Sequence, residues 1–215
     1  AHLESVRTTP ELRAAFNAVK PEVSAFFASI PLDEGLYARL TQLAETDEAR
    51  TLSPDRRRAL ERTLEDFRRH GAGLEPTNKR RLEAISRELA AYTSKFAQNV
   101  LDATAAWSLV VDDVSRIASA PATARAAARA AAEARGEKGW LFTLHAPSLV
   151  PALTHLDDGR LREEIYRAYY ARASEGELDN TDLVTKILGL RRRQADLLGY
   201  GSFPELVLEP RMAKT

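Results

Sequence analysis

Residues 82–100 read LEAISRELAAYTSKFAQNV, and this stretch decides the fold class. Its large apolar residues recur at steps of three or four positions. Such steps place them on one face of an α-helix, because an α-helix has about 3.6 residues per turn. The stretch therefore predicts one long amphipathic helix that begins after Pro76, with an apolar face made of Leu82, Ile85, Leu89, Tyr92, Phe96 and Val100.

Helix signals continue on both sides of this stretch. Thr8–Pro10 and Ser53–Asp55 each predict a helix start, because a hydroxyl can cap the first turn and proline is tolerated there. We expect Pro21 to kink or split the first of these helices, and Gly71 to end the second. Further helices are expected around residues 36–43, 122–135, 158–174 and 180–198.

Two short segments read as strands rather than helices. Trp107–Val111 and Trp140–Leu144 are rich in β-branched or aromatic residues and are bounded by polar residues or glycine, so we expect them to pair. The predicted fold is mainly α, a multi-helix bundle-like lobe with a small two-stranded β element. It divides into a helical part over residues 1–106, a strand–helix–strand insert over 107–145 and a second helical part over 146–215.

The composition excludes several classes of protein. Lys and Arg number 31 and Asp and Glu number 31, so no net charge favours a nucleic acid or a membrane surface as a partner. The chain has no cysteine and no apolar run long enough to cross a membrane, and we expect it in the cytoplasm. Its first residue is Ala1 rather than Met, which fits a processed or excised segment.

The histidines do not form a recognisable metal motif. A zincin needs two histidines one helical turn apart, with a glutamate between them that activates water. None of the four histidines begins such a motif; they are His2, His70, His145 and His155. One alternative remains: His145 and His155, together with the aspartates at 157 and 158, could hold a metal if the loop between them folded back. Histidines near loops are more often hydrogen-bonded or solvated.

Other candidate motifs have simpler interpretations. Gly199–Phe203 superficially resembles a phosphate loop, but it follows a predicted helix and lacks the Lys-Ser/Thr ending, so we interpret it as a helix-terminating turn. Glu163 and Glu164 are adjacent and point about 100° apart on a helix, which is unsuitable for a catalytic pair. The aromatic residues are interpreted as core-filling, namely Trp107, Trp140, Tyr166, Tyr169 and Tyr170. The residue patterns assign no catalytic, cofactor-binding or metal-binding residue.

Six short blocks, in this order and at these spacings, resemble the amino-terminal half of the oligopeptidase A/thimet oligopeptidase family. They are His2–Val6, Pro10–Arg13, Asn99–Thr104, Leu161–Tyr169, Arg172–Ser174 and Leu197–Tyr200. The closing residues, Met212–Thr215, also resemble the family's continuation, cut off in mid-sequence. Together the blocks span almost the whole chain.

The resemblance implies a two-lobed zinc metallopeptidase that hydrolyses short peptides, with its HExxH helix in a carboxyl-terminal catalytic domain. No residue of this chain matches a zinc ligand, the general-base glutamate or a later substrate-binding residue of that family. The resemblance thus implies a channel-wall lobe that is inactive and binds no zinc by itself, and whose partners are the missing catalytic domain and short peptides. An uncovered apolar patch is expected where that domain docks.

Two further hypotheses follow from the resemblance. The segment Trp140–Leu144 could bind substrate backbone through a strand edge, or it could merely join two helical layers. The whole chain could instead be a free-standing helical binding or scaffold module, derived from the family without its catalytic half.

Overall fold

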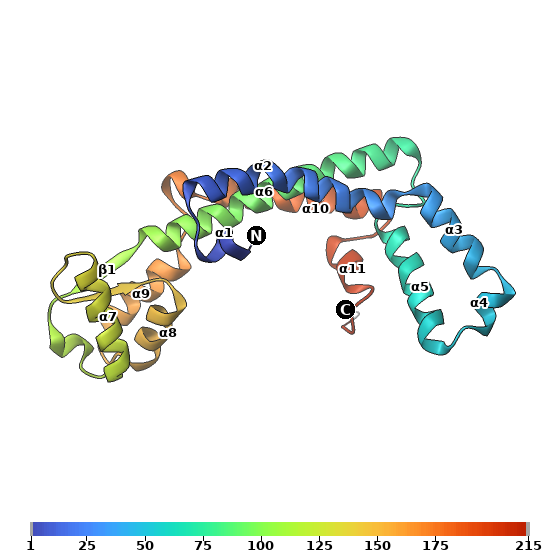
Figure 1. Ribbon diagram of the computed structural model, residues 1–215. Helices are drawn as coiled ribbons and strands as arrows, with labels where there is room; N and C mark the ends of the chain where they lie inside the picture. The colour runs from blue at the N-terminus through green and yellow to red at the C-terminus, as the bar shows by residue number, and fades with distance from the viewer. Residues whose placement is uncertain (1, 214–215) are drawn as a thin grey trace. The chain divides into compact units, whose positions relative to one another are not determined.

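The computed structural model describes residues 2–213, which form two compact units. Unit 1 contains the residues up to Ser94 and those from Leu183 onward, and unit 2 contains Lys95–Asp182. The structure is mainly α with one small antiparallel sheet, which confirms the predicted fold class (Figure 1). The finer division at residues 106 and 145 stays a prediction.

Unit 1 is built from helices alone. Its elements are α1 (His2–Val6), α2 (Pro10–Ser29), the 3₁₀ turn η1 (Ile30–Leu32), α3 (Glu34–Ala44), α4 (Asp47–Thr51), α5 (Pro54–Arg69) and α11 (Phe203–Leu208), with the first part of α6 (Pro76–Ala106) and most of α10 (Thr181–Leu197). The long helix predicted after Pro76 is therefore present as α6, and it continues into unit 2.

Local capping explains where several of these helices start and stop. The Thr9 hydroxyl accepts a hydrogen bond from the Leu12 N–H at 3.2 Å, so the predicted start of α2 is confirmed. Gly71 has a φ of +98° and follows the end of α5, as expected for a left-handed stop. Of the two effects expected of Pro21, a kink or a split, the split is wrong, because α2 is continuous from Pro10 to Ser29, and the kink stays a prediction. Proline's fixed φ suits a helix, and the loss of one backbone hydrogen bond does not end it here.

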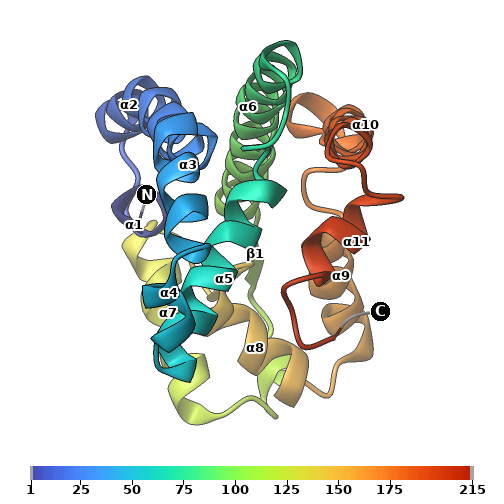
Figure 2. The ribbon, with the colours of Figure 1, turned by 90° about the vertical axis from the view of Figure 1, so that its right-hand side faces the viewer.

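Helices α3 and α5 pack side by side within unit 1 (Figures 1 and 2). The rings of Tyr37 and Phe67 are stacked with their centroids 5.8 Å apart, and Phe67 is buried. Lys79, at the start of α6, is also buried, and its Nζ lies 2.6 Å from Glu34 Oε1 on α3. Because a buried ammonium needs a partner, this ion pair fixes the contact between α3 and α6.

Unit 2 surrounds the small sheet with helices. Its elements are the end of α6, β1 (Ser108–Val111), η2 (Val114–Ile117), α7 (Ala122–Ala134), β2 (Trp140–Thr143), α8 (Ala146–His155), α9 (Gly159–Tyr170) and η3 (Gly176–Leu178). The strands pair antiparallel, with Ser108 opposite Thr143 and Val111 opposite Trp140, which confirms the predicted pairing. Gly139 precedes β2 with a φ of +108°, and a Cβ there would lie 2.4 Å from the Val111 carbonyl oxygen.

One apolar core holds unit 2 together. Its fully buried members come from η2 and α9, namely Ile117, Leu161 and Ile165, and the sheet contributes Val111 and Phe142. Helix α8 was not predicted, because the segment between His145 and His155 was expected to be a loop. Pro147 lies in the first turn of α8, where proline is tolerated, and Pro151 lies inside the helix without ending it.

Candidate functional site

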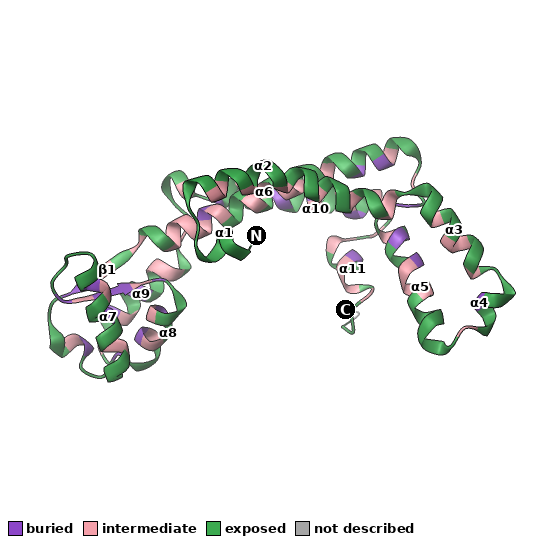
Figure 3. Cartoon of the chain, in the orientation of Figure 1, coloured by how far each residue is buried: buried purple, intermediate pink, exposed green. Residues whose placement is uncertain are grey.

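Helix α2 carries an apolar stripe that no described part of the chain buries (Figure 3). None of its 20 residues is buried. The stripe consists of Val19, Val23, Phe26 and Phe27, together with the C-cap residue Ile30, and these residues are exposed by 40 to 64%. Apart from the adjacent Phe26 and Phe27, they follow one another at steps of three or four positions, which places them on one side of the helix. We call this group the α2 stripe.

The α2 stripe has the character of an uncovered docking surface. The Phe26 and Phe27 rings contact each other edge-to-face, with centroids 5.5 Å apart, yet both remain more than 60% exposed. Single exposed apolar residues are ordinary, but a contiguous exposed group is typical of an interface. A helix in a folded protein is stabilised mostly by packing of its apolar face, so α2 is suited to a partner surface.

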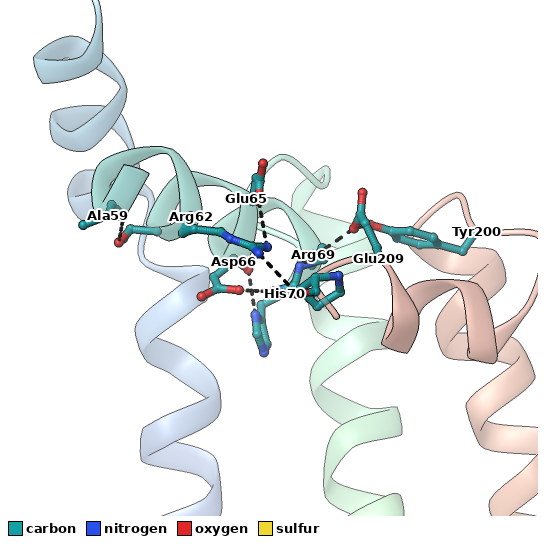
Figure 4. A network of polar contacts seen from close by, with 10 residues as sticks. Ala59, Arg62, Glu65, Asp66, Arg69, His70, Tyr200 and Glu209 are labelled. Atoms are coloured by element: carbon teal, nitrogen blue, oxygen red, sulfur yellow. Dashed lines mark hydrogen bonds and ion pairs between the residues drawn. The ribbon is translucent and has the colours of Figure 1, made fainter. Parts of the chain in front are cut away.

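A polar network joins α5 to the segment around α11 within unit 1 (Figure 4). The Tyr200 hydroxyl donates to Glu209 Oε2 at 2.6 Å, and Arg69 Nε lies 3.8 Å from the same carboxylate oxygen. Arg69 also pairs with Asp66 on its own helix. Burial and the hydrogen bond to Glu209 raise the pKa of Tyr200 to about 12, so this phenol is neutral at physiological pH.

The same network contains a second contact between residues that are far apart in the sequence. Arg62 Nη2 donates to the Pro210 carbonyl oxygen at 3.3 Å, and its Nη1 lies 3.5 Å from Glu65 Oε2. His70 Nδ1 lies 2.6 Å from the Asp66 carbonyl oxygen, so this nitrogen is the donor. These groups pair with one another, and the network therefore fixes the segment around α11 against α5 rather than presenting a reactive group.

Three of the residues considered as metal ligands lie at the ends of helices. His145 is the N-cap residue of α8 and His155 lies in its last turn. Asp158 caps α9 through the N–H groups of Arg160 and Leu161, and its Oδ2 lies 2.6 Å from Arg116 Nε. Residues 2–213 contain no group of three His, Cys, Asp or Glu side chains that could hold a metal ion. The described donors therefore do not fit a zinc site.

Strand β2 is largely buried within unit 2. Leu141, Phe142 and the following Leu144 are buried, and the Thr143 N–H already donates to Ser148 Oγ at 3.0 Å. In β1, by contrast, Ser108 and Val110 are exposed. No observation tests a contact of Trp140–Leu144 with substrate, and it stays a prediction.

The interpretation of the aromatic residues as core-filling is confirmed for some and wrong for others. Trp107, Trp140 and Tyr169 are partly buried against the core of unit 2. Tyr166 and Tyr170 are instead 50% and 67% exposed on α9. Spacing alone could not separate them, because all three tyrosines lie within five positions at the end of one helix.

A helical chain with an uncovered apolar helix is typical of one lobe of a larger protein. Comparison with known families supports this class: residues 1–79 match the Neurolysin/Thimet oligopeptidase N-terminal domain, and residues 152–215 match Peptidase family M3. The chain belongs to the M3 peptidase family and corresponds to the amino-terminal part of an M3 oligopeptidase, which confirms the resemblance seen in the sequence.

Similar proteins extend this match over the whole chain. "Oligopeptidase A" of Escherichia coli (strain K12) is 37% identical over 100% of this chain and 32% of its own length. "Probable cytosolic oligopeptidase A" of Arabidopsis thaliana is 36% identical over 99% of this chain and 31% of its own length. "Dipeptidyl carboxypeptidase" of Salmonella typhimurium is 31% identical over 99% of this chain and 32% of its own length. The chain thus spans about a third of the length of these relatives. None of its described helices is long and apolar enough to cross a membrane.

Proposed function

We propose that this chain is a non-catalytic lobe of a zinc-dependent oligopeptidase that hydrolyses short peptides in the cytoplasm. The lobe forms part of the wall of the substrate channel and contributes no catalytic residue and no zinc ligand. Its main partner is the remaining part of the enzyme, which docks on the α2 stripe.

The observation that carries this proposal is similarity along the whole chain to proteins named oligopeptidase A, at 36 to 37% identity. These relatives are about three times as long as the chain, so there is room for a separate catalytic part. The exposed Phe26 and Phe27 rings support a docked partner, since burial of two such rings would remove a large apolar area from water.

In the longer enzyme, zinc would polarise the scissile carbonyl and activate the attacking water. Among residues 2–213 no group of three His, Cys, Asp or Glu side chains that could hold a metal is found. The contribution that we assign to this chain is to support the docked part and to select substrates by access.

The test compares the 215-residue chain with the protein purified from its natural source. We expect the natural protein to be about three times the 23.8 kDa of this chain, to contain zinc and to hydrolyse a fluorescence-quenched peptide until a chelator is added. The chain alone should bind no stoichiometric zinc and release no fluorescence.

Two results would contradict the proposal. Zinc-dependent hydrolysis by the purified 215-residue chain would show that it contains a catalytic site. A natural protein near 24 kDa without zinc would instead indicate a free-standing helical binding or scaffold module. Circular dichroism of the purified chain is the control that it is folded when its activity is measured.

A further inference from the structure

Strand β1 has one paired edge and one free edge. Its four residues, Ser108–Val111, pair with β2 on one side only. Helices α7 and α8 pack along β2, whereas β2 is the one described element that packs extensively along β1. Ser108 and Val110 are both exposed, Val110 by 38%. The outer edge of β1 is therefore open to solvent.

The direction of the backbone groups at this edge follows from a hydrogen bond on β2. The Thr143 N–H donates to Ser148 Oγ at 3.0 Å, so it does not point toward β1. Opposite residues of an antiparallel pair alternate between exchanging two hydrogen bonds and exchanging none. Ser108, opposite Thr143, and Val110, opposite Leu141, therefore exchange none, and their N–H and C=O groups point away from β2.

The contact of Gly139 with β1 agrees with this direction. A Cβ on Gly139 would lie 2.4 Å from the Val111 carbonyl oxygen, so this carbonyl faces β2, as the alternation requires. Among residues 2–213, neither Ser108 nor Val110 takes part in a backbone hydrogen bond outside the sheet. The free edge thus offers two N–H and two C=O groups at the spacing with which another extended strand pairs.

The two ends of this edge carry charges of opposite sign. At the Ser108 end, the exposed Arg135 donates from Nη1 to Ser108 Oγ at 3.1 Å. At the other end, the exposed Asp112 and Asp113 directly follow β1. The turn before β2 adds one charge of each sign at residues 137–138. A peptide with a free amine and a free carboxylate complements these ends when it runs antiparallel to β1.

The length of the edge favours a short peptide over a second copy of this chain. Four extended residues span about 13 Å. Pairing through so short a strand buries far less than the roughly 1,000 Å² that a stable interface between two proteins needs. A peptide of about four residues can use the whole edge, and main-chain pairing accepts different side chains.

We propose that the outer edge of β1 binds the backbone of a short extended peptide that runs antiparallel to the strand. The N–H and C=O groups of Ser108 and Val110 pair with the peptide backbone, Arg135 pairs with its carboxylate, and Asp112 attracts its amine. This inference rests on the proposed function, since it gives the substrate-selecting lobe a way to hold peptides of different sequence. It concerns β1 and not the segment Trp140–Leu144.

The test is an NMR titration of the ¹⁵N-labelled 215-residue chain with the peptide Thr-Val-Thr-Val, whose two ends are free. We expect a dissociation constant on the order of 1 mM and shifted amide signals at residues 108–112. Hydrogen exchange reports on the edge directly. The Leu109 and Val111 amides should be protected in the free chain, whereas the Val110 amide should exchange fast and slow down when the peptide is added.

A matched probe separates backbone pairing from other contacts. The same peptide with its three amide nitrogens methylated keeps the charges and the side chains but has no amide N–H to donate. It should bind about tenfold more weakly or not at all, because each lost hydrogen bond would leave a C=O group of β1 unpaired.

Variants of the chain assign the binding to β1. Val110→Pro removes the outward N–H, and proline is tolerated on a strand edge where the N–H faces solvent, so the variant should fold and lose the peptide. Val110→Thr is the matched control, because it keeps the N–H and the β-branched shape, and it should bind within about twofold of the unsubstituted chain. Arg135→Gln should weaken the peptide with a free carboxylate by about threefold and leave its carboxamide form unchanged.

Several outcomes would overturn the inference. They are absence of binding, equal binding of the methylated peptide, binding that survives Val110→Pro, and shifts confined to other residues. Shifts at residues 108–111 that depend on the concentration of the chain without peptide would show that a second copy occupies the edge. If Val110→Pro does not fold by circular dichroism, the methylated peptide still decides the question on the unsubstituted chain. None of these outcomes bears on whether the longer protein hydrolyses peptides, which the zinc and hydrolysis assays decide separately.

Discussion

At the scale of single residues, a buried pair of asparagines carries the most consequence. Asn99 on α6 is 2% exposed, and its Nδ2 donates to Asn180 Oδ1 at 2.9 Å. Asn180 Nδ2 in turn donates to the Phe96 carbonyl oxygen at 3.1 Å, and the Asn180 N–H holds Ala173, which has a strained φ of +55°. Both side chains are amides, so the pair fixes the loop after α9 without the cost of burying a charge.

Asn180→Ala should therefore destabilise the chain by about 2 kcal/mol, because it leaves the buried Asn99 Nδ2 without its acceptor and removes the additional hydrogen bond that the Phe96 carbonyl oxygen accepts. Urea unfolding followed by circular dichroism measures the change. Ser174→Ala is the matched control, since it removes an exposed hydrogen bond from the same loop and should cost less than about 0.5 kcal/mol. Equal effects of the two substitutions would mean that the asparagine pair is not a special contact.

Asn99 also shows what a sequence can indicate about a residue. It opens one of the blocks that carry the family resemblance, so the sequence marked its position. Its partner lies 81 residues away, and no periodicity or capping rule connects two positions at that separation. Arg172 is a similar case, because its sequence block was recognised while its contact with Tyr169 and its unpaired donor are visible only in the structure.

At the scale of elements, helices with a regular apolar face were predictable and those with unusual prolines were not. The spacing from Leu82 to Val100 predicted α6, and the Thr9 cap predicted the start of α2. Helix α8 was missed because Pro147 and Pro151 argue for a loop, and because its N-cap residue, His145, makes no side-chain capping hydrogen bond. Tertiary packing decides this segment, since Leu149 and Ala152 of α8 belong to the core of unit 2.

The cap of α9 gives this element a specific dependence on pH. The Leu161 N–H and the Arg116 guanidinium lower the pKa of Asp158 below its ordinary value of 3.8. Because the folded pKa is lower than the unfolded one, the charge of Asp158 stabilises the fold above pH 3.8, and this contribution is lost as pH falls through the folded pKa.

Asp158→Asn isolates that charge, because asparagine can still accept the capping hydrogen bonds. At pH 7 the variant should unfold at a lower urea concentration than the unsubstituted chain, and the difference should disappear well below pH 3.8. Asp157→Asn, at the neighbouring exposed position, is the control and should show a smaller difference at pH 7. A difference between Asp158→Asn and the unsubstituted chain that is the same at both pH values would contradict the assignment to this carboxylate.

At the scale of the whole molecule, the α2 stripe connects the fold to the proposed function. The sequence predicted an uncovered apolar patch from the resemblance but could not locate it, because a periodic apolar face looks the same whether it is buried inside the chain or left for a partner. The structure separates these cases: the apolar face of α5 buries Leu64 and Phe67, whereas Phe26 and Phe27 stay exposed.

Replacing both Phe26 and Phe27 by Ser should therefore affect the chain and the longer enzyme differently. In the 215-residue chain the two rings are more than 60% exposed, so the double substitution should change the free energy of unfolding by less than about 1 kcal/mol. In the full-length enzyme the same rings would be buried against the catalytic part, and losing them should cost several kcal/mol, on the order of 3 or more. Thermal unfolding of both proteins measures the contrast, with Val150→Ser as a control at a similarly exposed residue of α8. If the double variant unfolds the chain itself, α2 is held by contacts within unit 1; if it leaves the full-length enzyme as stable as before, the catalytic part docks elsewhere.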